Sequence, residues 1–312
     1  MRSYSMDTLK MICAILIIFI HTPKPEIYQE SLAPIYRCAV PIFFMISGFF
    51  TYGKNGLNDV IRKRIIGQLK ILCWGVGLYF IVSLIKEGPS AVEKMQHFLT
   101  PSFFMFNTLP YGGHLWYIIA YIYILVIMLF VEKYNLYKPL FIITPILLVG
   151  TIAIGTYSEI FLSSTFPVPY SRNFLFTGLP FFSLGMIVKH FKPALSTPLL
   201  ITSMIMSYIL GLAEVHYLGV FGGDCYLSTI FLSASTFLLF LNIKQPKDTL
   251  FSKIGREDGL YIYVLHFIIA NFTNKYSAQV PILLYISTPL VLLLTLLLID
   301  ILKKTKVIGK LI

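Results

Sequence analysis

The feature that most constrains this sequence is a series of apolar stretches that recurs along its 312 residues. About 20 consecutive apolar residues form a helix long enough to cross the hydrocarbon core of a bilayer. We find ten such stretches, at 5–22, 34–52, 65–85, 114–131, 139–157, 173–189, 196–212, 219–241, 258–275 and 281–301. They predict an all-α integral membrane protein, a bundle of about ten transmembrane helices in a single domain, 1–312.

Composition excludes a soluble protein. Hydrophobic residues make up 57% of the chain and charged residues only 12%, whereas charged residues are about a quarter of soluble domains. A soluble globule of this size would leave much of that apolar area facing water. A cytosolic or secreted enzyme is therefore excluded.

The net charge of +11 indicates orientation rather than nucleic-acid binding, because the basic residues stand in short segments between the apolar stretches. If the N-terminus is cytoplasmic, 19 of the 25 basic residues fall on the inner side, namely Arg2, Lys10, Lys54, Arg62, Lys63, Arg64, Lys70, Lys133, Lys138, Lys189, Lys192, Lys244, Lys247, Lys253, Arg256, Lys303, Lys304, Lys306 and Lys310. The positive-inside rule then predicts that both termini are cytoplasmic. The apolar connection 86–113 is expected to lie on or dip into the membrane. The cysteines lack metal-ligand spacing, so no metal site is expected.

The first stretch holds the polar groups that are most costly to place in lipid. Asp7 and Lys10 are three residues apart, and His21 follows Lys10 by eleven, so all three share one helix face that would line a cavity. Imidazole titrates near neutral pH, which makes His21 a candidate general base, and Lys10 would then either serve as an electrostatic anchor or keep its partner Asp7 ionised. Alternatively, Lys10 snorkels to the inner headgroups beside Asp7, and His21 is the interfacial residue that ends the helix.

Candidate substrate-binding residues follow in the second stretch and at the start of the fourth. Arg37 could bind an anionic substrate or anchor the interface, and Ser47 with Gly48 allows another helix to approach closely. His114 is expected to face His21 from the same leaflet, whereas the neighbouring Trp116 also fits an interfacial aromatic belt.

Three further polar residues need partners if they are buried. Arg172 opens the sixth stretch, Asp224 lies in the eighth and His266 in the ninth. Arg172 and His266 are candidate substrate-binding residues, and a satisfied structural hydrogen bond is the alternative for each. On the expected cytoplasmic side, Arg62-Lys63-Arg64 forms a compact basic patch that either sets topology or binds the phosphates of a nucleotide-bearing donor.

Four segments in order resemble blocks of the integral-membrane acyltransferase family 3. Residues 6–10 (MDTLK) with His21 match the [R/K]-x10-H signature, 40–49 (VPIFFMISGF) resembles VPxFFxxSG, 114–117 (HLWY) resembles HLWF/Y, and 261–266 (YIYVLH) resembles a late YxxH element. The resemblance implies a bacterial inner-membrane enzyme of ten helices that moves an acyl group, usually acetyl from cytoplasmic acetyl-CoA, to a hydroxyl of a cell-surface polysaccharide or lipid-linked glycan.

By motif position, the resemblance makes His21 catalytic and Lys10 its partner. It makes Arg62-Lys63-Arg64 the counterpart of a basic cytoplasmic donor motif, although the spacing departs from the family's RxxR pair. Besides the glycan acceptor, the expected partners are membrane lipids and either a polysaccharide-synthesis complex or a second copy. No nucleic-acid partner is expected.

Two other functions remain open. The family includes the membrane portion of vancomycin-resistance serine racemases, suggested to carry serine, whose second-helix motif resembles residues 37–48 of this chain. A small-molecule carrier or lipid-glycan flippase would use Asp7, Lys10, Asp224 and His266 as a substrate or proton path. A purely structural bundle that scaffolds polysaccharide synthesis is the third possibility.

Overall fold

A computed structural model describes residues 3–53, 56–98, 100–219 and 224–305 of the chain. Within these ranges every regular element is a helix and no strand occurs, as predicted. The first half forms α1 (Tyr4–His21), α2 (Glu26–Ser31), α3 (Ala33–Tyr36), α4 (Ala39–Phe49), α5 (Leu57–Glu87), α6 (Pro89–Lys94), α7 (Pro101–Phe106), α8 (Trp116–Lys133) and α9 (Tyr137–Ile154). The second half forms α10 (Ser158–Leu162), α11 (Leu179–Phe191), α12 (Thr197–Leu218), α13 (Leu227–Asn242), α14 (Leu250–Glu257), α15 (Gly259–Tyr276) and α16 (Leu283–Lys304).

Shorter helical turns join these helices. Three are 3-10 turns, η1 (Met95–His97), η2 (Gly113–Leu115) and η3 (Val168–Tyr170), and η4 (Phe174–Gly178) is a π-helical turn that leads into α11. In the described part of the chain, seven helices are long and apolar enough to cross a membrane: α1, α5, η2 with α8, α9, η4 with α11, α12 and α16.

All ten expected stretches contain a helix in the described residues, although the number that cross the membrane and the side of each terminus stay predictions. The second stretch is interrupted, because α3 ends at Tyr36 and α4 begins at Ala39. Pro41 then lies in the first turn of α4, where its missing N–H costs no hydrogen bond. The eighth stretch is shorter than expected, so Asp224 lies in the connection before α13 and not within a helix.

Parts of three predictions lie outside the described residues. They are positions 220–223 of the eighth stretch, residue 99 of the connection 86–113, and the basic residues Arg2, Lys54, Lys306 and Lys310 that enter the orientation argument. The described part of 86–113 folds into α6, η1 and α7. Phe104 and Met105 are exposed there. Membrane contact by this connection stays a prediction.

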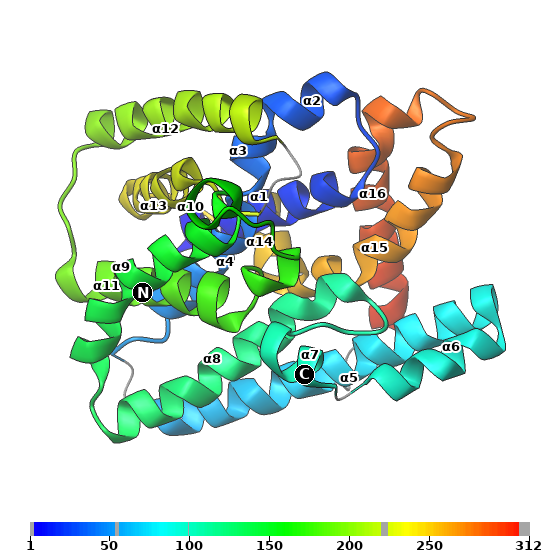
Figure 1. The fold of residues 1–312 in the computed structure, drawn as a ribbon, viewed down its shortest axis with the longest axis horizontal. Coiled ribbons are helices and arrows are strands. Elements are labelled where there is room, and N and C mark those ends of the chain that lie inside the picture. The colour runs from blue at the N-terminus through cyan, green and yellow to red at the C-terminus, as the bar shows by residue number, and fades with distance from the viewer. Residues whose placement is uncertain (1–2, 54–55, 99, 220–223, 306–312) are drawn as a thin grey trace.

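α1 is the central helix of the bundle, in contact with α3, α4, α13, α14, α15 and α16. Figure 1 shows α5 and α8 side by side along one edge, and α15 and α16 together at another. The outer faces are apolar. On α9, for example, Ile142, Ile146 and Val149 are each more than 60% exposed at helical spacing. Such a stripe faces lipid in a membrane protein and would be unfavourable in water.

α4 and α11 cross with their backbones in direct contact. A methyl group on Gly48 would lie 1.9 Å from the carbonyl oxygen of Phe182, and one on Gly185 would lie 2.0 Å from that of Met45. Small residues allow this close approach because no side chain separates the two helices. The predicted role of Gly48 in close helix packing is confirmed. The contact holds α4, and Arg37 just before it, in a fixed position against α11.

Candidate functional site

A cavity of about 370 Å³ lies at the end of α1 that carries His21. Six residues singled out from the sequence line its wall: His21, Arg37, His114, Trp116, Arg172 and Asp224. They come from α1, the α3–α4 junction, η2 with α8, the segment before η4, and the connection before α13. Much of the remaining wall is apolar. The cavity therefore gathers polar groups from five parts of the chain in a low-dielectric setting.

Local contacts fix the end of α1 that presents His21. The backbone carbonyl of His21 accepts a hydrogen bond from the Asn274 side chain on α15, at 2.9 Å. Thr22 Oγ1 lies 2.8 Å from Thr288 Oγ1 on α16. Two neighbouring helices thus hold the last turn of α1, while the imidazole of His21 stays half-buried on the cavity wall.

Three imidazoles cluster at this point. The ring centroid of His21 is 5.3 Å from that of His266 and 6.2 Å from that of His114, and the last two are 5.4 Å apart. Phe267 stacks on His114 at 4.7 Å, and Tyr79 of α5 meets it edge-on at 4.9 Å. The expected proximity of His114 to His21 is present. His266 is fully buried behind His21 and does not line the cavity.

Backbone carbonyls fix the tautomers of two of these rings. His266 Nδ1 lies 2.9 Å from the carbonyl oxygen of Ile262, and His114 Nε2 lies 3.4 Å from that of Val264. Because a carbonyl oxygen only accepts, each of these nitrogens carries the proton. The other nitrogens, His266 Nε2 and His114 Nδ1, are then acceptors, and both are buried without a hydrogen-bond partner among the described residues.

The cavity wall also carries two guanidiniums around one carboxylate. Asp224 accepts hydrogen bonds from Arg37 Nη1 and from Arg172 Nε and Nη2, the last at 3.0 Å. Burial raises the pKa of the Asp224 carboxyl, but the two guanidiniums outweigh it and the net shift is downward. Burial, with Arg37 nearby, lowers the pKa of Lys24 to about 8. Two guanidinium charges against one carboxylate leave this wall positive.

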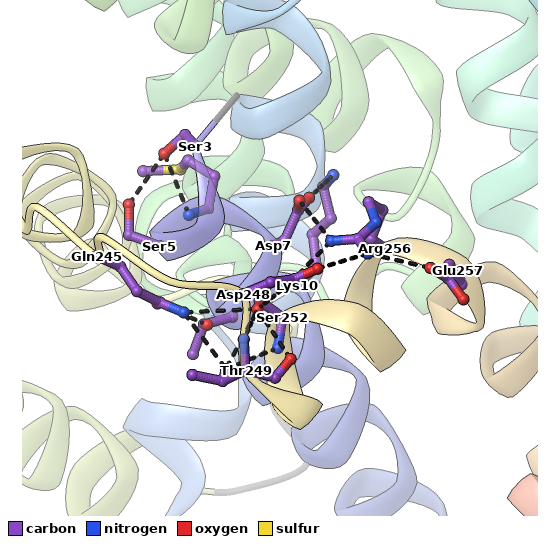
Figure 2. A network of polar contacts seen from close by, with 12 residues as sticks. Ser3, Ser5, Asp7, Lys10, Gln245, Asp248, Thr249, Ser252, Arg256 and Glu257 are labelled. Carbon is purple, nitrogen blue, oxygen red and sulfur yellow. Dashed lines mark hydrogen bonds and ion pairs between the residues drawn. The ribbon is translucent and has the colours of Figure 1, made fainter. Parts of the chain in front are cut away.

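The structure separates Asp7 and Lys10 from His21. Lys10 Nζ pairs with Asp7 at 2.8 Å, and Arg256 of α14 approaches Asp7 at 3.8 Å while also pairing with Asp248. Figure 2 shows this network at the other end of α1. The expected single polar stripe along one cavity is wrong, because neither Asp7 nor Lys10 is on the cavity wall and the buried Ala14 lies between them and His21 on α1.

Arg256 is a neighbour of Asp7 that the sequence did not predict, because Arg256 was used only as one of the basic residues that set the membrane orientation. Gly255 allows its helix to dock, because a methyl group there would lie 2.1 Å from the carbonyl oxygen of Asp7. The Arg37–Asp224–Arg172 cluster was missed for a related reason. Arg37 and Asp224 are 187 residues apart, and nothing local to either one signals the other.

Comparison with known proteins now decides the family. The family described as an acyltransferase domain, acyltransferase family 3, matches residues 3–303. The chain belongs to this family. It is also similar to an amino-acid racemase of Enterococcus faecalis, with 24% identity over 308 residues that cover 90% of this chain and 43% of the relative.

A second amino-acid racemase of Enterococcus faecalis is 28% identical over 204 residues, which cover 59% of this chain and 28% of the relative. The chain thus spans less than half the length of these curated relatives. No solved structure matches it.

The basic patch of this acyltransferase-family chain lies far from the cavity. Arg62 and Lys63 are exposed on the first turns of α5, and Arg64 donates to Thr51 Oγ1 at 2.5 Å. Fifteen residues of α5 separate Arg64 from Tyr79, which touches His114, or about 22 Å at the rise of an α-helix. Ser47 is not on the cavity wall either, and its carbonyl accepts from Thr51 at 2.6 Å, beside the patch.

Proposed function

We propose that this chain is a membrane O-acyltransferase of a bacterial cytoplasmic membrane. It moves an acetyl group from cytoplasmic acetyl-CoA to a hydroxyl of a cell-surface polysaccharide or lipid-linked glycan precursor. The observation that carries the proposal is the imidazole of His21 on the wall of a cavity that Arg37 and Arg172 also line. Family membership supports the same reaction class.

In the proposed reaction, His21 acts as the general base. Its unprotonated nitrogen removes the proton from the acceptor hydroxyl as the hydroxyl oxygen attacks the thioester carbonyl carbon. The guanidiniums of Arg37 and Arg172 stabilise the negative charge on the carbonyl oxygen, which is most effective in a dry site. The carbon–sulfur bond then breaks, and the thiolate takes the proton from His21, which leaves the ester and free coenzyme A.

The donor would bind from the expected cytoplasmic side. The exposed Arg62 and Lys63 fit the phosphates of coenzyme A as charge partners. Nearby, Tyr52 Oη lies 2.7 Å from His190 Nδ1, so the end of α11, which carries Lys189, lies beside the turn that follows α4. An acyl donor held at this patch must extend about 22 Å along α5 to reach the histidines.

The proposal is tested by the acetate that mild alkali releases from cell-envelope glycan. We expect a deletion strain complemented with the wild-type chain to carry ester-linked acetate. His21→Ala should lower it at least about 100-fold, since loss of a general base costs 10²–10⁴ in rate. His216→Ala is the matched control, because His216 is exposed on α12. Full acetylation with His21→Ala would overturn the assignment of the base.

Donor binding has a separate test. Acetyl-CoA should raise the melting temperature of the purified protein, because a ligand that binds only the folded state stabilises it. Arg62→Ala/Lys63→Ala should shift this effect to higher donor concentration, whereas Lys244→Ala/Lys247→Ala, which removes two exposed cations elsewhere, should not. Equal donor affinity in both double variants would remove the patch from the donor site.

A second candidate function is carriage of an amino acid such as serine. It is favoured by the similarity of 90% of this chain to part of an amino-acid racemase. Here Arg37 and Arg172 would hold the substrate carboxylate, since guanidiniums pair well with carboxylates. Uptake of labelled serine into proteoliposomes without acetyl-CoA, lost in Arg37→Met, would favour the carrier. Donor-dependent ester formation without uptake would favour the acyltransferase.

A further inference from the structure

Two buried acceptor nitrogens lie beside the proposed base without a donor. His266 Nε2 and His114 Nδ1 have no hydrogen-bond partner among the described residues. They cannot satisfy each other, because both are lone-pair acceptors once the opposite nitrogens donate to Ile262 and Val264. A buried polar atom left without a partner is costly, and its retention calls for an explanation.

His21 is the neighbour that can supply the missing proton. A neutral imidazole has one acceptor nitrogen and one N–H. If the acceptor nitrogen faces the substrate hydroxyl, the N–H points away from the substrate. His266 is the nearer of the two other imidazoles, at 5.3 Å between ring centroids against 6.2 Å for His114. At 5.3 Å, an end-on N–H···N hydrogen bond is within reach.

Burial separates the roles of His114 and His266. His114 lines the cavity, where a substrate can meet it, whereas His266 is 0% exposed and absent from the cavity wall. Substrate therefore cannot contact His266, whereas the ring of His21 is its neighbour. In the present structure the two rings touch without the hydrogen bond. A rotation of the His21 ring forms the bond with or without substrate, because the half-buried His21 borders open space in which its ring can turn.

We propose that His266 is a positioning residue whose Nε2 accepts a hydrogen bond from the N–H of His21. The bond fixes the His21 tautomer that presents a lone pair to the acceptor hydroxyl. It also stabilises the imidazolium that forms when His21 takes the proton, the part that a carboxylate plays in a Ser-His-Asp triad. The inference rests on the proposed function for this catalytic role, although the hydrogen bond can be tested without it.

The kinetic test compares His266→Gln with His266→Leu. Gln can place an amide oxygen near the position of Nε2 and keep an acceptor, whereas Leu fills the space without one. We expect His266→Leu to lower kcat about 10- to 100-fold, the range that loss of a histidine's hydrogen-bond partner costs in metal sites, with little change in KM for the acceptor. His266→Gln should recover most of the loss. Equal activity of the Leu variant and wild type, or equal losses in Leu and Gln variants with unchanged melting temperatures, would overturn the proposal.

A spectroscopic test does not depend on turnover. In nanodiscs with ¹⁵N-labelled histidine, the signal absent from His266→Gln identifies His266. We expect its Nε2 resonance to move in His21→Ala but not in the control His190→Ala, which alters an exposed ring at the other end of the bundle. An Nε2 resonance unaffected by His21→Ala would refute the hydrogen bond. If His21→Ala loses acyl transfer but His266→Leu transfers normally, only this inference is refuted. If the wild-type protein forms no ester at all, the proposed function is refuted.

Discussion

Replacing Asp224 with asparagine removes the carboxylate that Arg37 and Arg172 share on the cavity wall. The three side chains differ in exposure, at 20% for Asp224, 13% for Arg37 and 37% for Arg172. Because solvent screens exposed charges, the Arg172–Asp224 pair should contribute less to stability than the Arg37–Asp224 pair. Asp224→Asn keeps the shape and one acceptor oxygen, so its effect reports on charge.

The expected loss follows from these exposures. Leaving the nearly buried Arg37 without its carboxylate should cost about 3 kcal/mol, the low end for a broken buried pair. The partly exposed Arg172 adds at most about 1 kcal/mol. A neutral hydrogen bond to the Asn oxygen returns about 1 kcal/mol. We therefore expect Asp224→Asn to lower the free energy of unfolding by about 2–3 kcal/mol.

Denaturant unfolding in mixed micelles measures this difference. Asp300→Asn is the matched control, because Asp300 and its partner Lys304 are 57% and 76% exposed, and their pair should contribute little. Equal stability of the two variants would refute the reasoning. The wild-type advantage over Asp224→Asn should also depend on pH with a definite sign. Since the folded pKa of Asp224 lies below 3.8, the advantage should be complete above that pH and disappear as the pH falls below it.

Three further predictions follow from the same structure. Lys10→Arg should keep the ion pair with Asp7 and have a melting temperature near that of wild type, whereas Lys10→Ala should lower the free energy of unfolding by at most about 1 kcal/mol. Equal melting temperatures of the two variants would show that the charge at position 10 does not affect stability. Gly48→Ala should destabilise by about 1–3 kcal/mol in the same unfolding assay, because its methyl group meets the Phe182 backbone. By contrast, Gly77→Ala should be neutral or stabilising by up to about 1 kcal/mol, since nothing lies within 4 Å of its added methyl group, and a larger loss there than at Gly48 would contradict the packing.

Several features of the site could be predicted from the sequence because they depend on local spacing. The eleven-residue interval between Lys10 and His21 places His21 at the end of α1, and the structure ends that helix there. Glycine beside Ser47 predicts close packing, and α4 meets α11 at that point. His114 was expected near His21 because both lie at span ends in the same leaflet, and their rings are 6.2 Å apart.

The partners of charged residues could not be predicted in this way. Asp7 and Lys10 were placed in one stripe with His21, but α14 docks on α1 through Gly255 and gives Asp7 the guanidinium of Arg256 as a neighbour. Asp224 was expected inside a helix, where it would have needed an unknown partner. Because the helix begins only at Leu227, Asp224 lies in a connection and can reach two arginines.

The sequence by itself determined that the chain is a bundle of membrane helices, because the length and apolar character of a span are set by the bilayer and are visible in about 20 consecutive residues. It also determined which polar residues would be costly to bury. Only the tertiary structure decided which of these meet, because the rotation of each helix and the path of each connection depend on packing between distant segments. Thus His21 meets His266, 245 positions later, and Arg37 meets Asp224. Their chemistry arises from that packing.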